Sequence, residues 1–235
     1  MKEIDFSQFE ERIGIVFSDK ALLAQAFTHR SYINENKTRT LVHNERLEFL
    51  GDAVLELVVT DYLFKKFPEK PEGELTAYRS ALVNSTALSS VATAIGVNDF
   101  LLLSHGEAKD VGRARQYILA NALEAIIGAI YIDRGYDSAK LFIEKNVLTL
   151  LPDIVDKKGW LDAKSWFQEQ AQEKNGVTPS YRTLKEAGPD HDKQFTVGLF
   201  IGEEKVVTGE GKSKQEAEQD AARRGLVEKG WDSSS

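Results

Sequence analysis

Residues 43–57 read HNERLEFLGDAVLEL, and this stretch decides the fold because it carries two different helical faces. At 100° per residue, three acids fall within about 60° of one another on one side: Glu45, Glu48 and Asp52. Apolar residues recur at helical spacing on the other side: Leu47, Leu50, Val54, Leu57 and Val58. The stretch therefore predicts a long helix, from about residue 44 to residue 67, that is buried along one face and acidic along another.

The acidic face needs an explanation because carboxylates three and four residues apart repel one another. No Lys or Arg falls among these acids on the same face of the helix. A helix this apolar should be buried on most sides, where an unpaired carboxylate is costly. A hard cation such as Mg²⁺ or Mn²⁺, which prefers oxygen ligands, would neutralise the charge. The alternative is a solvated acidic stripe without a ligand.

A second helix is predicted over residues 118–131, which read ILANALEAIIGAIY. This stretch is apolar nearly all round, as expected for a buried helix. Its few polar groups are Asn121 and Glu124, which share a face at a spacing of three residues. A buried Glu beside an Asn needs a partner, and the acids of the first helix together with a Mg²⁺ ion would supply one. Oxygen ligands from two helices are a common way to build a metal site in an all-α core.

Composition limits the class of protein. The chain has 235 residues, 42% of them hydrophobic, and a net charge of −7, so any nucleic-acid contact must come from a local basic patch. The absence of cysteine excludes disulfides and thiolate sites. The N-terminus lacks the pattern of a signal peptide, and no apolar run approaches the roughly 20 residues of a membrane span. We expect a soluble, cytoplasmic protein that does not contact a membrane.

Two domains are expected, joined by a linker. Residues 1–151 have helical spacing throughout and predict an all-α domain, and residues 152–160 carry charge, Pro and Gly, as linkers do. Residues 161–230 change character and predict a small α+β domain with the order α-β-β-β-α. We place its helices at residues 162–174 and 213–229, and its strands at residues 179–184, 194–201 and 204–209.

The beginning of the last helix is informative. Ser213 and Glu216 fit a capping box, so the helix N-terminus lies between Lys212 and Lys214. Cations are disfavoured at the positive end of a helix dipole. Two lysines there make sense if an anion such as phosphate docks at that end, whereas the alternative is a solvated cap with no ligand.

These features together resemble a known family. Residues 43–52 look like the signature of the bacterial ribonuclease III family, residues 118–129 resemble its second motif, and residues 162–229 resemble a double-stranded RNA-binding domain. The resemblance implies a Mg²⁺-dependent endonuclease, with Mn²⁺ as a possible substitute, that cuts double-stranded RNA to leave 5′-phosphate and 3′-hydroxyl ends. It also implies a homodimer formed through the nuclease domain, and a role in rRNA and mRNA processing and RNA decay.

The resemblance carries roles to individual residues. Asp52 and Glu124 match the family's catalytic pair, and Glu45 matches a supporting acid. The implied metal ligands are Glu48, Asp52, Asn121 and Glu124. The family usually has Asp where this chain has Asn121, and an amide removes one negative charge from the site. We expect weaker metal binding rather than a dead enzyme.

In the C-terminal domain, the resemblance implies that the RNA duplex is recognised by its shape. Gln168, Glu169 and the loop Pro189-Asp190-His191 would lie at the minor groove. Lys212, Lys214 and Gln215 would face phosphates in the adjacent major groove. Gln215 stands where the family often has a further Lys, so binding should be weaker and less steeply dependent on salt.

Two other functions compete with this interpretation. A double-stranded RNA-binding protein that has lost turnover is suggested by Asn121, although the remaining acids argue against it. A metal-dependent nucleotide pyrophosphohydrolase would share the carboxylate-lined helices, but it does not predict residues 162–229.

Overall fold

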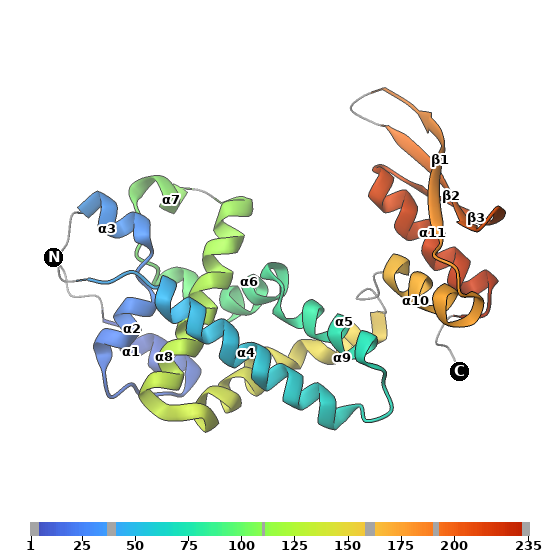
Figure 1. Cartoon of the computed structure of the whole chain (residues 1–235). Coiled ribbons are helices and arrows are strands. Elements are labelled where there is room, and N and C mark those ends of the chain that lie inside the picture. Colours follow the sequence, from blue (N-terminus) through green and yellow to red (C-terminus); the bar gives the residue numbers. More distant parts are fainter. Residues whose placement is uncertain (1–4, 37–40, 110, 158–162, 190–192, 232–235) are drawn as a thin grey trace. The chain divides into compact units, whose positions relative to one another are not determined.

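The computed structural model separates into two compact units, residues 1–160 and residues 161–235. It describes residues 5–36, 41–109, 111–157, 163–189 and 193–231. The first unit is helical and the second combines helices with one sheet (Figure 1). Both fold classes predicted from the sequence are confirmed. Among the described residues, none of the helices combines the length and apolar composition needed to cross a bilayer.

The first unit is built around α4 (Glu45–Lys66) and α8 (Arg113–Asn146), which pack against each other more extensively than any other two elements described (Figure 1). Leu55 on α4 and Leu123 and Ile126 on α8 have no exposed surface. Burial of each such side chain contributes about 1.5–3 kcal/mol, so this crossing is the centre of the core. The remaining helices are α1 (Ser7–Ile13), α2 (Lys20–Ala26), α3 (Arg30–Asn36), α5 (Glu72–Val83), α6 (Ser85–Ala94), α7 (His105–Lys109) and α9 (Leu151–Lys157).

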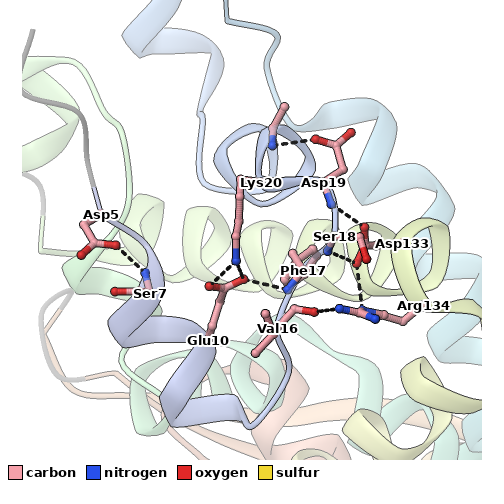
Figure 2. Close-up of polar contacts among 11 residues, drawn as sticks. Asp5, Ser7, Glu10, Val16, Phe17, Ser18, Asp19, Lys20, Asp133 and Arg134 are labelled. Atoms are coloured by element: carbon pink, nitrogen blue, oxygen red, sulfur yellow. Dashed lines mark hydrogen bonds and ion pairs between the residues drawn. The ribbon is translucent and has the colours of Figure 1, made fainter.

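Polar contacts join the loop between α1 and α2 to α8 (Figure 2). The carboxylate of Asp133 accepts hydrogen bonds from the backbone N–H groups of Ser18 and Asp19, both at 2.8 Å. The guanidinium of Arg134 donates to the carbonyl of Val16. These contacts come directly before Gly135, whose φ of 79° interrupts the helical conformation inside α8. The sequence predicts a turn here followed by a separate helix, and the structure agrees, because the non-helical Gly135 separates two helical stretches within α8.

The predicted linker differs from the structure over most of its length. The sequence analysis assigns residues 152–160 to a linker, whereas α9 covers Leu151–Lys157. Pro152 lies in the first turn of α9, where proline removes no hydrogen bond. Leu151 is buried, and Ile154 and Val155 pack against the core of the first unit. This burial stabilises the segment as a helix. It could not be recognised from the charge and proline content on which the linker assignment was based. Residues 158–160 lie outside the described part of the chain.

The second unit has α10 (Ala163–Asn175) and α11 (Lys214–Glu228) on one face of an antiparallel sheet (Figure 1). The strands are β1 (Ser180–Ala187), β2 (Gln194–Ile201) and β3 (Glu204–Gly211), in that order. Phe167 of α10, Leu199 of β2 and Ala221 of α11 are fully buried together. The predicted order α-β-β-β-α is confirmed, and β1 and β3 extend beyond their predicted ends.

Candidate active site

Two glycines allow α4 and α8 to approach closely enough for their backbones to touch. A Cβ atom at residue 51 would overlap the carbonyl oxygen of Glu124, and a Cβ atom at residue 128 would overlap the carbonyl oxygen of Leu47. No other amino acid fits at Gly51 or Gly128 unless the helices separate. The backbone of Glu124 therefore lies directly against the turn of α4 that carries Glu48 and Asp52.

The acids of the two helices form one interacting group. Burial, together with the negative charges of Asp52 and Glu48, raises the pKa of the Glu124 carboxyl to about 8. Burial also raises the pKa of Glu48, and the charges of Glu45 and Asp52 add to this effect. Glu48 and Glu124 are half-buried, whereas Asp52 is exposed. The charges of Asp52 and Glu48 on α4 thus act on Glu124 of α8, and the metal site predicted from these residues stays a prediction.

Asn121 contacts the same group from α8. Its side chain makes a hydrogen bond with Glu48 that lowers the pKa of the Glu48 carboxyl. The side-chain amide is the donor, which a carboxylate at this position could not be. Asn121 therefore stabilises the charged form of Glu48. Compared with an Asp at this position, it also leaves the site with one negative charge fewer.

Glu45 has partners of its own at the margin of the group. Its carboxylate lies 3.0 Å from the guanidinium of Arg30 and 3.6 Å from Nδ1 of His43. No Lys or Arg lies on the acidic face of α4 itself, but Arg30 reaches Glu45 from α3 and forms an ion pair with it. Within the described residues, neither Asp52 nor Glu124 forms an ion pair with an arginine or a lysine.

The donors suit a hard divalent cation. Carboxylates of Glu48, Asp52 and Glu124 and the amide oxygen of Asn121 are the ligand types that Mg²⁺ prefers. The raised pKa of Glu124 reports a concentration of negative charge that such a cation would neutralise. Within the described residues, no three His, Asp or Glu side chains already stand close enough to hold a metal ion. Binding would therefore require the carboxylates to move toward the ion.

The predicted RNA-binding residues lie on the surface of the second unit. Gln168 and Glu169 are exposed on α10, and Lys212, Lys214 and Gln215 are exposed at the beginning of α11. The hydroxyl of Ser213 accepts the N–H of Glu216 at 3.1 Å, as the capping box predicts. The carboxylate of Glu216 accepts the N–H of Lys212 instead of that of Ser213. His191 lies outside the described residues, as does Asp190.

Two charged residues near these sites were missed by sequence reasoning. Arg30 lies 15 positions before Glu45, and Glu186, which contacts Lys214 at 2.8 Å, lies 28 positions before its partner. Neither pair has the short spacing by which helical ion pairs are recognised. Only the tertiary fold brings the partners together.

Comparison with known proteins gives matches for both units. Residues 19–151 match the family model described as Ribonuclease-III-like, and residues 163–228 match the double-stranded RNA binding motif. The chain is 46% identical to Ribonuclease 3 of Enterococcus faecalis over 220 residues, which are 94% of this chain and 95% of that protein. It is 41% identical to Ribonuclease 3 of Nitratiruptor over 226 residues, which are 96% of each protein.

Solved structures match the first unit. A nuclease domain of ribonuclease III from Campylobacter jejuni, reported for flexibility in a region involved in dimer formation, is 40% identical. The match covers 63% of this chain and 99% of that one, with a TM-score of 0.57. A second structure of this domain is 41% identical and covers 65% of this chain and 98% of that one, with a TM-score of 0.56.

We predict that Gly51→Ala destabilises the protein, because the added methyl group overlaps the backbone of α8. Overpacking of this kind costs about 3 kcal/mol of unfolding free energy, measurable by urea denaturation. Gly106→Ala is the matched control, since a Cβ atom there would come no closer than 3.9 Å to the Ser104 hydroxyl. Equal stability of the two variants would contradict the close approach of α4 and α8.

The raised pKa of Glu124 predicts a pH-dependent stability in the metal-free protein. Its carboxyl has a folded pKa of about 8 and an ordinary value of 4.5, so the folded state binds the proton more tightly. This contribution is complete below pH 4.5 and is lost as the pH rises through 8. Glu124→Gln cannot ionise and should be more stable than the parent by about 2 kcal/mol at pH 8, after allowance for solvent screening.

Thermal melts in a chelating buffer between pH 5 and pH 8.5 test this prediction. The difference in Tm between Glu124→Gln and the parent should widen with pH. A difference in Tm that stays constant across this range would show that folding does not raise the pKa of Glu124.

Proposed function

This chain belongs to the ribonuclease III family as an endoribonuclease with a double-stranded RNA-binding domain, and we propose that it uses Mg²⁺ to hydrolyse phosphodiester bonds in double-stranded RNA. We infer further that the products carry 5′-phosphate and 3′-hydroxyl ends, and that the enzyme acts in rRNA and mRNA processing and RNA decay in the cytoplasm. The observation that supports the proposal is that Asp52 and Glu48 act on Glu124, whose pKa is raised to about 8 by burial and by these two charges.

The metal site that we propose contains Glu48, Asp52, Glu124 and the amide oxygen of Asn121. A Mg²⁺ ion bound there would activate water, neutralise charge on the phosphoryl oxygens and stabilise the leaving oxygen. Asp52 and Glu124 are the proposed catalytic residues. Mn²⁺, which also takes oxygen ligands, should substitute.

Each residue of the site has a distinct task in this proposal. Glu124 loses its proton when the cation binds, because the ion offsets the charges that raise its pKa. Asn121 orients the Glu48 carboxylate by donating a hydrogen bond to it. Asn121 contributes no charge, so the cation should bind less tightly than it would with Asp at this position. Glu45, held by Arg30, supports the site from its margin.

The second unit supplies binding to the duplex. We propose that Gln168, Glu169 and His191 lie at the minor groove, and that Lys212, Lys214 and Gln215 face phosphates. Contacts of this kind recognise the A-form shape and carry no sequence information. The match to the double-stranded RNA binding motif supports this assignment and removes the reason to consider a nucleotide pyrophosphohydrolase.

An apolar stripe on α4 supports a homodimer. Phe49 is 81% exposed, Leu57 57% and Phe64 70%. At 100° per residue these three side chains fall within about 80° of one another, and the stripe lies beside the acidic face. Large exposed apolar residues gathered on one face mark interaction surfaces. We propose that two copies pair through this stripe, which would bring two acidic sites to one duplex, one for each strand.

We predict that Asp52→Asn removes cutting and leaves duplex binding intact, because it removes a charge from the proposed metal site and none from the RNA-binding unit. The assay incubates a long RNA duplex with each protein in Mg²⁺ or in Ca²⁺, followed by gel electrophoresis. The parent should give short duplex products only with Mg²⁺. Retardation without cutting by the parent in both ions would instead support a binding protein that has lost turnover.

We predict that Phe49→Glu converts the dimer to a monomer, because a charge would replace the most exposed apolar group of the proposed pairing stripe. Sedimentation velocity at micromolar concentration measures the mass. Val227→Glu on α11 is the control, since Val227 is 67% exposed and lies outside the stripe. A parent chain that sediments as a monomer, or a dimer that survives Phe49→Glu, would argue against this surface.

A further inference from the structure

One end of the sheet in the second unit brings a carboxylate to the RNA-binding lysines. Glu186 of β1 is the register partner of Phe195 on β2, and Phe195 is also the partner of Gly211 on β3. These three residues form a row across the sheet. The chain leaves β3 at Gly211, and α11 begins at Lys214, directly beside this row.

Lys214 is held by this row. Its ammonium nitrogen lies 2.8 Å from the carboxylate of Glu186 and 5.8 Å from the centre of the Phe195 ring. The hydrogen bond from Lys214 holds the pKa of Glu186 below its ordinary value, and the charges of Lys214 and Lys193 add to this effect. The ammonium thus has an intramolecular anion as its partner.

The other two residues proposed to face phosphates differ from Lys214. In the part of the chain that the structure describes, the ammonium of Lys212 forms no ion pair, and the side chain of Gln215 carries no charge. Lys214 is therefore half of the positive charge at the beginning of α11, and Glu186 cancels it. A phosphate approaching this surface meets one uncompensated lysine instead of two.

We propose that Glu186 limits the affinity of this protein for double-stranded RNA by holding Lys214 in an ion pair that a phosphate must displace. This inference deepens the proposed function and depends on the proposed contact between Lys214 and the RNA backbone. Glu186 itself touches no RNA in this scheme, so it is a residue that tunes binding rather than a binding residue.

The exposure of the pair allows such an exchange. The side chains of Lys214 and Glu186 are 57% and 41% exposed, so neither has to leave a buried position. Exposed ion pairs are weak because water and salt screen them. A phosphate on the highly charged duplex can compete with a single carboxylate, and the cost appears as reduced affinity.

Salt dependence provides a separate readout. Each phosphate neutralised by a lysine releases condensed counterions and steepens the fall of affinity with salt by about one unit of logarithmic slope. Displacement of Glu186 by a phosphate adds little net charge neutralisation. Removing the Glu186 charge should therefore both raise the affinity and steepen its salt dependence.

The experiment compares full-length Glu186→Gln with the parent in binding to a labelled RNA duplex of about 20 base pairs, longer than the roughly 16 that one such domain spans. Ca²⁺ replaces Mg²⁺, and fluorescence anisotropy is recorded from 0.05 to 0.3 M salt. We expect binding to be roughly fivefold tighter at 0.1 M salt, with a slope steeper by about one. Glu203→Gln is the control, since it removes the same charge from a pair with Arg182, and it should change affinity less than about twofold.

A double-mutant cycle separates release of Lys214 from simple loss of a negative charge. Lys214→Ala should weaken binding to all duplex sequences alike. In that background Glu186→Gln should give less than half of its free-energy gain, because no lysine is left to release. An equal gain in both backgrounds would overturn the proposed exchange.

The remaining outcomes are distinct. Weaker binding by Glu186→Gln would mean that the carboxylate positions Lys214 for RNA, and unchanged binding would mean that the pair is irrelevant; either overturns the inference. Glu186→Thr, which suits a strand, repeats the test with another neutral side chain in case Gln disturbs the sheet. A parent chain that binds no duplex would contradict the proposed function itself.

Discussion

The contact between the backbones of α4 and α8 at Gly51 and Gly128 is the constraint on which the rest of the nuclease unit depends. Without side chains at these two positions, the carbonyls of Glu124 and Leu47 meet the opposite helix directly. The acids of α4 and α8 are thereby brought together by the tightest packing in the core. Their mutual repulsion, reported by the high pKa of Glu124, is sustained by the apolar burial around them. The close packing of α4 against α8 therefore both stabilises the fold and makes ionisation of Glu124 less favourable.

The two units handle charge in opposite ways. In the nuclease unit, burial and the charges of Asp52 and Glu48 raise the pKa of Glu124, and Asn121 donates a hydrogen bond to Glu48. At the beginning of α11, the sheet provides Lys214 with a carboxylate. We propose that the first arrangement attracts a cation and that the second moderates the attraction of an anion.

Much of this architecture could be predicted from the sequence. Periodicity alone predicted the acidic face of residues 43–57, the position of Asn121 and Glu124 on a second apolar helix, and the order of elements in the second unit. It was wrong for Leu57, which it placed on the buried face and which is 57% exposed. These features are local, since each depends on residues within one element.

The features that could not be predicted are non-local or depend on burial. Arg30 reaches Glu45 from another helix, and Glu186 reaches Lys214 across the sheet. The helix α9 forms over a charged segment because Leu151 is buried and Ile154 and Val155 pack against the core.

The helix α4 presents its acids and its apolar stripe on adjacent faces along the same 22 residues. A single added or deleted residue between Glu48 and Phe64 would rotate everything beyond it by about 100°. Such a change would turn the part of the stripe beyond it away from its present face, and a change before Gly51 would also misplace Gly51 and Asp52 relative to Glu48. A single side chain on α4 can be replaced without changing this geometry. The number of residues in the helix is constrained, because it sets the angle between the acidic face and the apolar stripe.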